Sequence, residues 1–137
     1  MEELMSFVFN NETPIYLQLI DDIKLQIINK VYLPNAKLPS VRELSVMYEV
    51  NPNTIQKALA QLEEEKLIFT ERTNGKYVTD DLSLIHSIRD TTIHNMIDDF
   101  YVSMSRLGLN KEQVLQILNN ERNNYGYFTS KEYYKKI

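Results

Sequence analysis

The sequence predicts a mainly α-helical protein with one small β-hairpin, and three features of the chain support this fold class. Residues 37–57, KLPSVRELSVMYEVNPNTIQK, contain two helix-start signals only a few positions apart. An Asn-Gly pair then lies between two short apolar runs, which is typical of a hairpin turn. After Ser83, apolar residues recur at helical spacing for about 23 residues. In chain order, we expect a helix, a helix-turn-helix, a hairpin and two more helices.

A first helix is expected to begin at Pro14. Thr13 is a favourable N-cap residue, and proline suits the first helical position because its missing N–H would have no partner there. Apolar residues follow on one face at helical spacing, namely Ile15, Leu19, Ile23 and Ile27. This stripe predicts a core helix that packs beneath the two helices that come next.

The corner formed by two adjacent helix starts is the most informative part of the sequence. Ser40 and Glu43 form an S-x-x-E capping box, in which each side chain accepts a hydrogen bond from the backbone of the other residue. Asn51 followed by Pro52 is an N-cap residue with a proline at the first helical position. One short helix is therefore expected from about Val41 to Tyr48, and another from the proline. The short connection suits a helix-turn-helix, although two ordinary helices of a bundle would carry the same caps.

The second of these helices has a buried side and a polar side. Its apolar residues at helical spacing are Ile55, Ala58, Leu59 and Leu62. Because this stripe must face the core, the polar residues of the first two turns point outward, and these are Asn53, Thr54, Gln56 and Lys57. Amide and hydroxyl groups can pair with base edges in the DNA major groove, and an ammonium group can bind guanine or a phosphate. A solvated helix face is the alternative interpretation.

A hairpin is expected after the second helix of the pair. Residues 67–70 are predicted to form a strand, 73–75 a turn and 77–79 the returning strand. Arg72 and Lys76 flank the tip. In a wing that follows a recognition helix, cations at this place contact phosphate or reach into the minor groove. The expected architecture is a winged helix-turn-helix.

This region resembles the GntR family of transcriptional regulators. The matching segments follow the family's order, and they are residues 14–19 (PIYLQL), 38–44 (LPSVREL), 50–59 (VNPNTIQKAL), 62–68 (LEEEKLI) and the pair Asn74-Gly75. The NPNT sequence and a short C-terminal region are similar to the YtrA-like subfamily, whose members often repress operons for transporters of the ATP-binding-cassette type. The resemblance implies a repressor that binds an inverted-repeat DNA operator as a homodimer.

The resemblance also implies which residues contact the operator. The family's contact positions lie at the start of the first helix of the pair, on the recognition helix and in the wing. Together with the remaining wing residues, the DNA-binding candidates are Ser40, Arg42, Asn53, Thr54, Gln56, Lys57, Arg72, Asn74, Gly75 and Lys76. Many members carry arginines at the positions of Pro52 and Gln56, so their base preference does not transfer to this chain.

The expected DNA-binding domain has a net negative charge, which is unusual for a domain that binds DNA. Residues 1–80 carry 8 Lys and Arg against 12 Asp and Glu, a net charge of −4, whereas nucleic-acid-binding modules are typically basic. The cations expected on the binding face are Lys37, Arg42, Lys57, Arg72 and Lys76. The acids at positions 63–65 are expected to lie away from that face, where screening over about 8 to 10 Å mutes them. The acidic balance leaves open a winged-helix adaptor that binds protein and not DNA.

A domain boundary is expected at the acidic pair Asp80-Asp81. Residues 1–81 would form the DNA-binding domain, and residues 82–137 a helical region for dimerisation and for a possible effector. In that region a long helix is predicted to end at Gly108, and Asn110 is predicted to cap another helix.

We expect a homodimer, because two helices of this size cannot bury their apolar surface against each other alone. The residues predicted to form the interface are Ile88, Met96, Ile97, Phe100, Met104, Val114 and Leu118. The alternative is that the same stripe packs against the DNA-binding domain of its own chain.

Two features of the C-terminal region allow further interpretations. The tail from Glu121 is rich in aromatic residues, which predicts packing on the dimer, with a small-molecule site as the alternative. His86, Asp90 and His94 lie four residues apart and could share a metal ion, but such spacing is ordinary on a solvated helix and no further ligand is evident. We therefore predict no metal and no cofactor, and a small-molecule effector stays unidentified.

The composition excludes several classes of protein. The chain has 137 residues and no cysteine, so it has neither a disulfide framework nor a thiolate metal site. No apolar run approaches the roughly 20 residues needed to cross a bilayer, and the start lacks the positive segment of a secretory signal, so a cytoplasmic protein without a membrane partner is expected. The sequence has no phosphate-binding loop and no nucleophile with a base partner, so it is not expected to be an enzyme.

Overall fold

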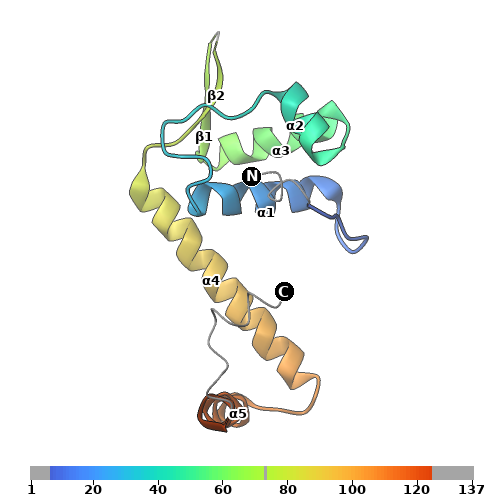
Figure 1. Ribbon diagram of the computed structural model, residues 1–137, viewed down its shortest axis with the longest axis vertical. Coiled ribbons are helices and arrows are strands. Elements are labelled where there is room, and N and C mark those ends of the chain that lie inside the picture. Colours follow the sequence, from blue (N-terminus) through green and yellow to red (C-terminus); the bar gives the residue numbers. More distant parts are fainter. Residues whose placement is uncertain (1–6, 73, 125–137) are drawn as a thin grey trace. The chain divides into compact units, whose positions relative to one another are not determined.

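The computed structural model describes residues 7–72 and 74–124, which form five helices and a two-stranded antiparallel sheet (Figure 1). The elements in chain order are α1 (Ile15–Ile28), α2 (Val41–Tyr48), α3 (Pro52–Glu64), β1 (Ile68–Glu71), β2 (Gly75–Val78), α4 (Leu82–Ser105) and α5 (Lys111–Asn124). The predicted fold class, mainly helical with one small hairpin, is confirmed. The chain divides into two compact units, Met1–Arg89 and Asp90–Ile137, and each is described by itself.

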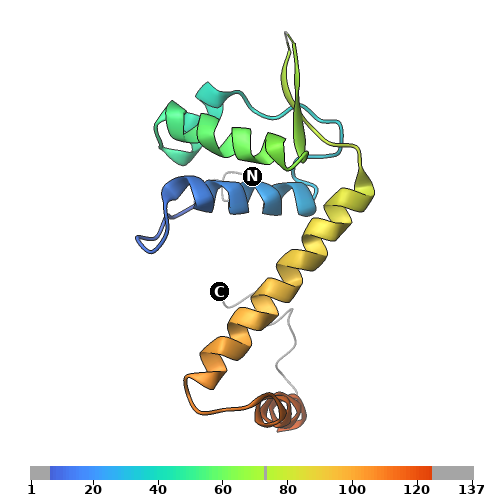
Figure 2. The same cartoon turned by 180° about the vertical axis from the view of Figure 1, so that it is seen from behind.

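Helix α1 is the core helix of the first unit, and Figures 1 and 2 both show it beside α3. Three of the four predicted stripe residues are buried, but Ile15 is 44% exposed at the start of the helix. The prediction that Thr13 caps this helix was wrong. Pro14 itself is the N-cap, because its ψ of 144° is extended and not helical. The Gln18 side chain instead holds the segment that precedes the helix. Its amide donates to the carbonyl oxygen of Thr13 at 2.8 Å and to that of Asn10 at 3.1 Å.

Helices α2 and α3 begin as their caps predict. The Ser40 hydroxyl accepts a hydrogen bond from the Glu43 N–H at 3.1 Å, and the Glu43 carboxylate accepts one from the Ser40 N–H at 3.0 Å. At the start of α3, the Asn51 side chain accepts a hydrogen bond from the Asn53 N–H at 2.8 Å, and Pro52 occupies the first turn. These local bonds satisfy backbone donors that a helix start leaves unpaired.

The turn between α2 and α3 is held by two local features. Glu49 ends α2 in the left-handed region with φ of 56°. The Ser45 hydroxyl then donates to the Val50 carbonyl oxygen at 2.5 Å, which satisfies an acceptor where the chain leaves the helix. The result is the tight corner that the sequence predicts.

The hairpin is shifted slightly from its predicted strands. Strand β1 begins one residue later than expected, and β2 begins at Gly75, which pairs with Glu71. Gly75 can pair at this place because its φ of +104° lets the chain turn back within the tip. Leu67 stays bound to the hairpin, since its carbonyl oxygen accepts a hydrogen bond from the Thr79 N–H at 2.8 Å.

The core of the first unit draws residues from every element of that unit. Leu19 of α1, Leu44 of α2, Leu62 of α3 and Ile68 of β1 are all at most 1% exposed. The first turns of α4 join this core through Ile85, with Leu84 and Ile88 packed against it. Helix α4 thus continues from the first unit into the second, and the domain boundary expected after residue 81 stays a prediction.

The second unit contains the remainder of α4 and helix α5. Gly108 follows α4 with φ of +83°, as the sequence predicts for a helix end. Asn110 and Gln113 exchange backbone-to-side-chain hydrogen bonds of 2.8 and 2.9 Å at the start of α5. The aromatic tail beyond residue 124 lies outside the described residues. Among the helices that the structure describes, none is long and apolar enough to span a bilayer.

Candidate nucleic-acid interface

Helix α3 buries one face completely and exposes the other. The four apolar residues of its predicted stripe are at most 1% exposed. On the other side Asn53, Gln56 and Lys57 are exposed and Thr54 is half-buried. The side chains predicted to read DNA are therefore accessible, and the buried stripe fixes the direction in which they point.

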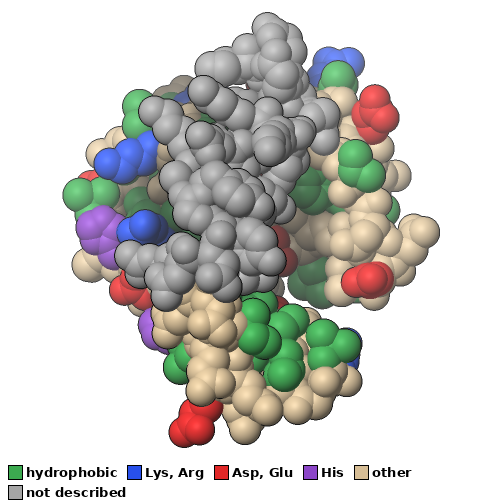
Figure 3. All heavy atoms as spheres, turned by 60° about the horizontal axis from the view of Figure 1, so that its bottom comes forward, with side chains coloured by type: hydrophobic (Ala, Val, Ile, Leu, Met, Phe, Trp, Pro, Cys, Tyr) green, Lys and Arg blue, Asp and Glu red, His purple; other side chains and the backbone are tan. Residues whose placement is uncertain are grey.

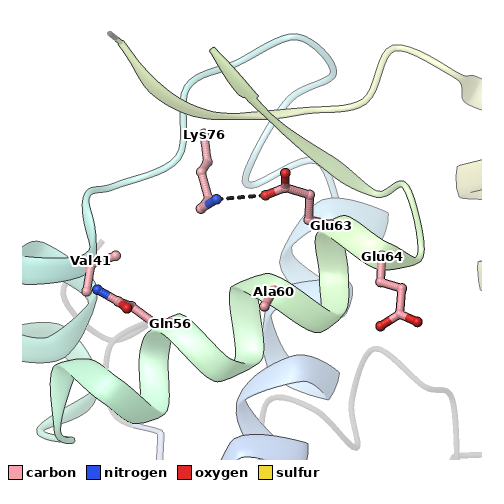
Figure 4. A pocket seen from close by; sticks show the side chains of 6 residues that line it. All are labelled: Val41, Gln56, Ala60, Glu63, Glu64 and Lys76. Atoms are coloured by element: carbon pink, nitrogen blue, oxygen red, sulfur yellow. Dashed lines mark hydrogen bonds and ion pairs between the residues drawn. The ribbon is translucent and has the colours of Figure 1, made fainter. Parts of the chain in front are cut away.

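A hollow of about 660 Å³ lies between α3 and the hairpin (Figure 4). Its lining residues come from the start of α2, from one side of α3 and from β2, and they are Val41, Gln56, Ala60, Glu63, Glu64 and Lys76. The small side chain of Ala60 leaves this space open in the middle of α3. The two candidates Gln56 and Lys76 are thus brought to one surface by the fold.

Lys76 does not lie free in this hollow. Its ammonium group donates to the Glu63 carboxylate at 2.7 Å and to the Thr70 hydroxyl at 2.7 Å, and that hydroxyl donates to the same carboxylate oxygen at 2.9 Å. The hydrogen bonds from Lys76 and then from Thr70 hold the pKa of the Glu63 carboxyl below its usual value. The Glu63 carboxylate is therefore charged at neutral pH.

The expectation that the acids at positions 63–65 lie away from the binding face was wrong for Glu63 and Glu64, which both line the hollow with Gln56 and Lys76. Glu65 does lie elsewhere, and its carboxylate is 2.8 Å from Lys24 on α1. Glu63 follows Gln56 and Ala60 at helical spacing, so the sequence did place it on the same side of α3. What the sequence could not supply was the position of the hairpin opposite that side.

A second group of residues joins α3 to the start of α1. The Lys57 ammonium lies 3.9 Å from the centre of the Tyr16 ring, a cation–π contact. Both residues line a shallow hollow of about 380 Å³ together with Ile15, Asn53 and Thr54. Sequence reasoning did not select Tyr16, because only the packing of α1 against α3 brings it to the reading helix.

The start of α2 and the hairpin tip supply the other candidates. Ser40 and Arg42 are exposed, and the Ser40 oxygen accepts the hydrogen bond of the cap. Arg72 and Asn74 are exposed at the tip. A Cβ added to Gly75 would lie 3.2 Å from the Lys37 side chain, so backbone conformation and space both favour glycine there.

The three residues weighed as an alternative metal site all lie on α4. His86, Asp90 and His94 are all exposed, and histidine side chains are visible on the surface in Figure 3. The His94 ring binds the Asp90 carbonyl oxygen through Nδ1 at 2.7 Å. Within residues 7–72 and 74–124, no three His, Asp or Glu side chains are grouped closely enough to hold a metal ion.

The residues predicted for dimerisation differ in exposure. Met96, Ile97, Phe100 and Leu118 are 39 to 65% exposed, and Met104 is half-buried. Val114 is only 2% exposed and belongs to the interior of the second unit. Ile88 packs on the core of the first unit. Met96, Ile97, Phe100 and Leu118 are thus apolar and accessible, and their role in dimerisation stays a prediction.

A recognition helix with an exposed polar face, a preceding capped helix and a two-stranded wing together define a winged helix-turn-helix. The family model described as bacterial regulatory proteins, gntR family, matches residues 15–78. The chain belongs to this family of DNA-binding transcriptional regulators.

Individual relatives agree with this assignment. The chain is 35% identical over 108 residues to the uncharacterized HTH-type transcriptional regulator YhcF of Bacillus subtilis, covering 79% of this chain and 89% of that protein. It is 43% identical over 70 residues to the HTH-type transcriptional repressor YtrA of Bacillus subtilis, covering 51% and 54% of the two chains.

Solved structures extend the likeness to the fold. A GntR family transcriptional regulator from Listeria monocytogenes is 39% identical, with a TM-score of 0.74 over 82% of this chain and 98% of that one. The DNA-binding domain of AraR, solved in complex with operator ORX1, is 27% identical with a TM-score of 0.50, over 53% of this chain and 93% of that one.

Proposed function

We propose that this regulator is a repressor that binds an inverted-repeat operator as a homodimer, with α3 in the major groove and the hairpin on the adjacent backbone. The observation that carries the proposal is the position of Asn53 and Gln56, which are exposed on a helix whose opposite face is fully buried. Amide side chains in this position can pair bidentately with adenine. The relative YtrA is named a repressor, and AraR was solved bound to an operator.

The homodimer is proposed from the accessible apolar side chains of α4 and α5. Met96 is 65% exposed and Ile97 47%, although both are large hydrophobic residues. A second copy that covers them would remove this surface from water. Dimers of helix-turn-helix proteins read two half-sites about 34 Å apart, and an inverted repeat matches their two-fold symmetry.

The regulatory role follows from this mode of binding. A dimer on its operator would block transcription, and a small-molecule effector bound between the subunits would change the separation of the two reading helices. The resemblance to YtrA-like regulators extends the proposal to an operon for a membrane transporter. Since the partner is chromosomal DNA, the protein would act in the cytoplasm.

A protein-binding adaptor is the second candidate, because residues 1–80 have a net charge of −4. Titration of the protein against duplex from its own promoter region, at low and at high salt, separates the two functions. A repressor protects an inverted repeat, and its affinity falls steeply as salt rises, because phosphate contacts release counterions. An adaptor gives no retained complex at either salt concentration, and that result would overturn the proposal.

A further inference from the structure

The hollow between α3 and the hairpin holds a carboxylate beside the cation that the hairpin would offer to a DNA phosphate. Glu63 comes from the same side of α3 as Gln56, and it faces Lys76 across the hollow (Figure 4). A carboxylate in this position repels phosphate, and it occupies the cation that the wing would otherwise offer to the DNA backbone. The proposed function alone does not require this residue.

We propose that the Glu63 carboxylate neutralises the charge of Lys76 on the DNA-binding face. The hairpin then contributes less affinity for the DNA backbone than its cations would supply if Lys76 were unpaired. This inference rests on the proposed function, and it names a residue that lowers the electrostatic part of DNA binding. The effect of Glu63 is weaker binding to DNA of any sequence, which leaves more of the discrimination to the base contacts of α3.

The hydrogen bonds of the Lys76 ammonium group support the proposal that its charge is compensated by Glu63. An ammonium group has three donors, and two of them are directed to Glu63 and Thr70 at 2.7 Å each. The Thr70 hydroxyl donates to the same carboxylate oxygen, so the three groups form a closed set that fixes the position of the lysine. A phosphate would have to displace this arrangement to gain the lysine.

The ion pair between Lys76 and Glu63 is partly exposed to solvent, which limits its strength. The Lys76 side chain is 28% exposed and the Glu63 side chain 40%. Water and salt screen such a pair, so its removal changes binding moderately and the fold little. The pair is therefore suited to adjusting affinity without holding the hairpin in place.

The test compares two neighbouring acids that differ in this contact. Glu64 also lines the hollow, and the structure gives it no ion pair within the described part of the chain. Glu63→Gln and Glu64→Gln remove the same charge, one residue apart. Each variant, and Glu63→Gln combined with Lys76→Gln, is titrated against promoter duplex and against a random duplex of equal length over a range of salt concentrations.

We expect Glu63→Gln to strengthen binding to the random duplex by about twofold to fivefold for each subunit, the range of a surface ion pair. The slope of log affinity against log salt should become steeper by about 0.9 for each subunit, because one more phosphate contact forms. Glu64→Gln should leave the slope unchanged. Adding Lys76→Gln should cancel the gain of Glu63→Gln.

Three outcomes would overturn the inference while leaving DNA binding intact. These are equal effects of the two single variants, a gain that persists without Lys76, and weaker binding by Glu63→Gln, which would make Glu63 a positioning or base-contacting residue. If wild-type protein binds neither duplex, the proposed function fails together with the inference. Thermal unfolding checks that Glu63→Gln is folded, and Glu63→Ala replaces it if it is not.

Discussion

Tyr48 anchors the last turn of α2 to α1 through one hydrogen bond. Its hydroxyl donates to the Asp22 carboxylate at 2.5 Å, and its ring packs edge-on to that of Phe7 with centroids 5.9 Å apart. A hydrogen bond to a charged group is stronger than one between neutral groups. The contact therefore helps to hold α2 in place against α1.

Replacing Tyr48 by Phe should lower the free energy of unfolding by about 1 to 3 kcal/mol, because the partly buried Asp22 loses its partner. Urea denaturation measures the change. Tyr77→Phe is the matched control, since its ring stacks on Phe69 in the hairpin and the described residues give its hydroxyl no hydrogen bond. Equal losses in the two variants would rule out the anchoring role.

Tyr48 should also make stability depend on alkaline pH. Burial and then the hydrogen bond to Asp22 raise the pKa of its hydroxyl, and burial followed by the Asp22 charge raises the pKa of Tyr32. Because the folded pKa exceeds the unfolded value near 10, the stabilisation is complete below about pH 10 and is lost as the pH rises above it. Unfolding measured on both sides of this pH should show a steeper loss in wild type than in Tyr48→Phe. Parallel curves would contradict this.

Individual side chains were predictable from sequence where a single helix decides their direction. Asn53 and Gln56 are exposed as predicted, because the buried stripe of α3 fixes its outer face. The contacts of Glu63 with Lys76, and of Lys57 with Tyr16, were not predicted. Each depends on another element packing beside α3, which periodicity along one helix does not contain.

At the scale of elements, the N-cap of α3 sets where the recognition helix begins. Asn51→Ala removes the side-chain acceptor of the Asn53 N–H and should destabilise the protein by about 1 kcal/mol. Thermal unfolding measures this change. Asn53→Ala is the matched control: its exposed side chain should affect DNA binding while unfolding stays within about 0.5 kcal/mol of wild type. A reversed order of the two stabilities would show that the cap does not support α3.

The helix-turn-helix could be placed accurately from sequence because its start signals are local. Ser40 with Glu43, and Asn51 with Pro52, satisfy backbone groups within one turn, so distant residues do not change the result. The start of α1 and the bounds of the strands were less accurate. The backbone of Pro14 and the positive φ of Gly75 moved those bounds by one or two residues.

At the scale of the whole molecule, the proposed dimer depends on one side of α4. Phe100→Glu should shift the protein from dimer to monomer in sedimentation analysis, because a charge replaces an apolar side chain within the proposed interface. Val102→Glu is the matched control. Val102 is 52% exposed and lies on nearly the opposite side of the helix from Phe100, so its variant should stay dimeric. A monomeric wild type, or equal dissociation of both variants, would contradict the interface.

Net charge alone does not indicate whether the first unit binds DNA. The net charge of residues 1–80 gives no support to DNA binding, and the arrangement of individual groups decides the question. Helix periodicity assigns a residue to one side of its own helix. The distance between the two cation-bearing elements, α3 and the hairpin, follows only from the packing of the core.

The most direct test of the account is the ratio of affinities for promoter and random duplex, measured for wild type and for Gln56→Ala. If α3 reads bases through its exposed amides, the ratio should fall by roughly fivefold to 150-fold for each half-site, since a lost base contact costs about 1 to 3 kcal/mol. Binding to the random duplex should stay unchanged. An unaltered ratio would show that the exposed face of α3 does not read DNA.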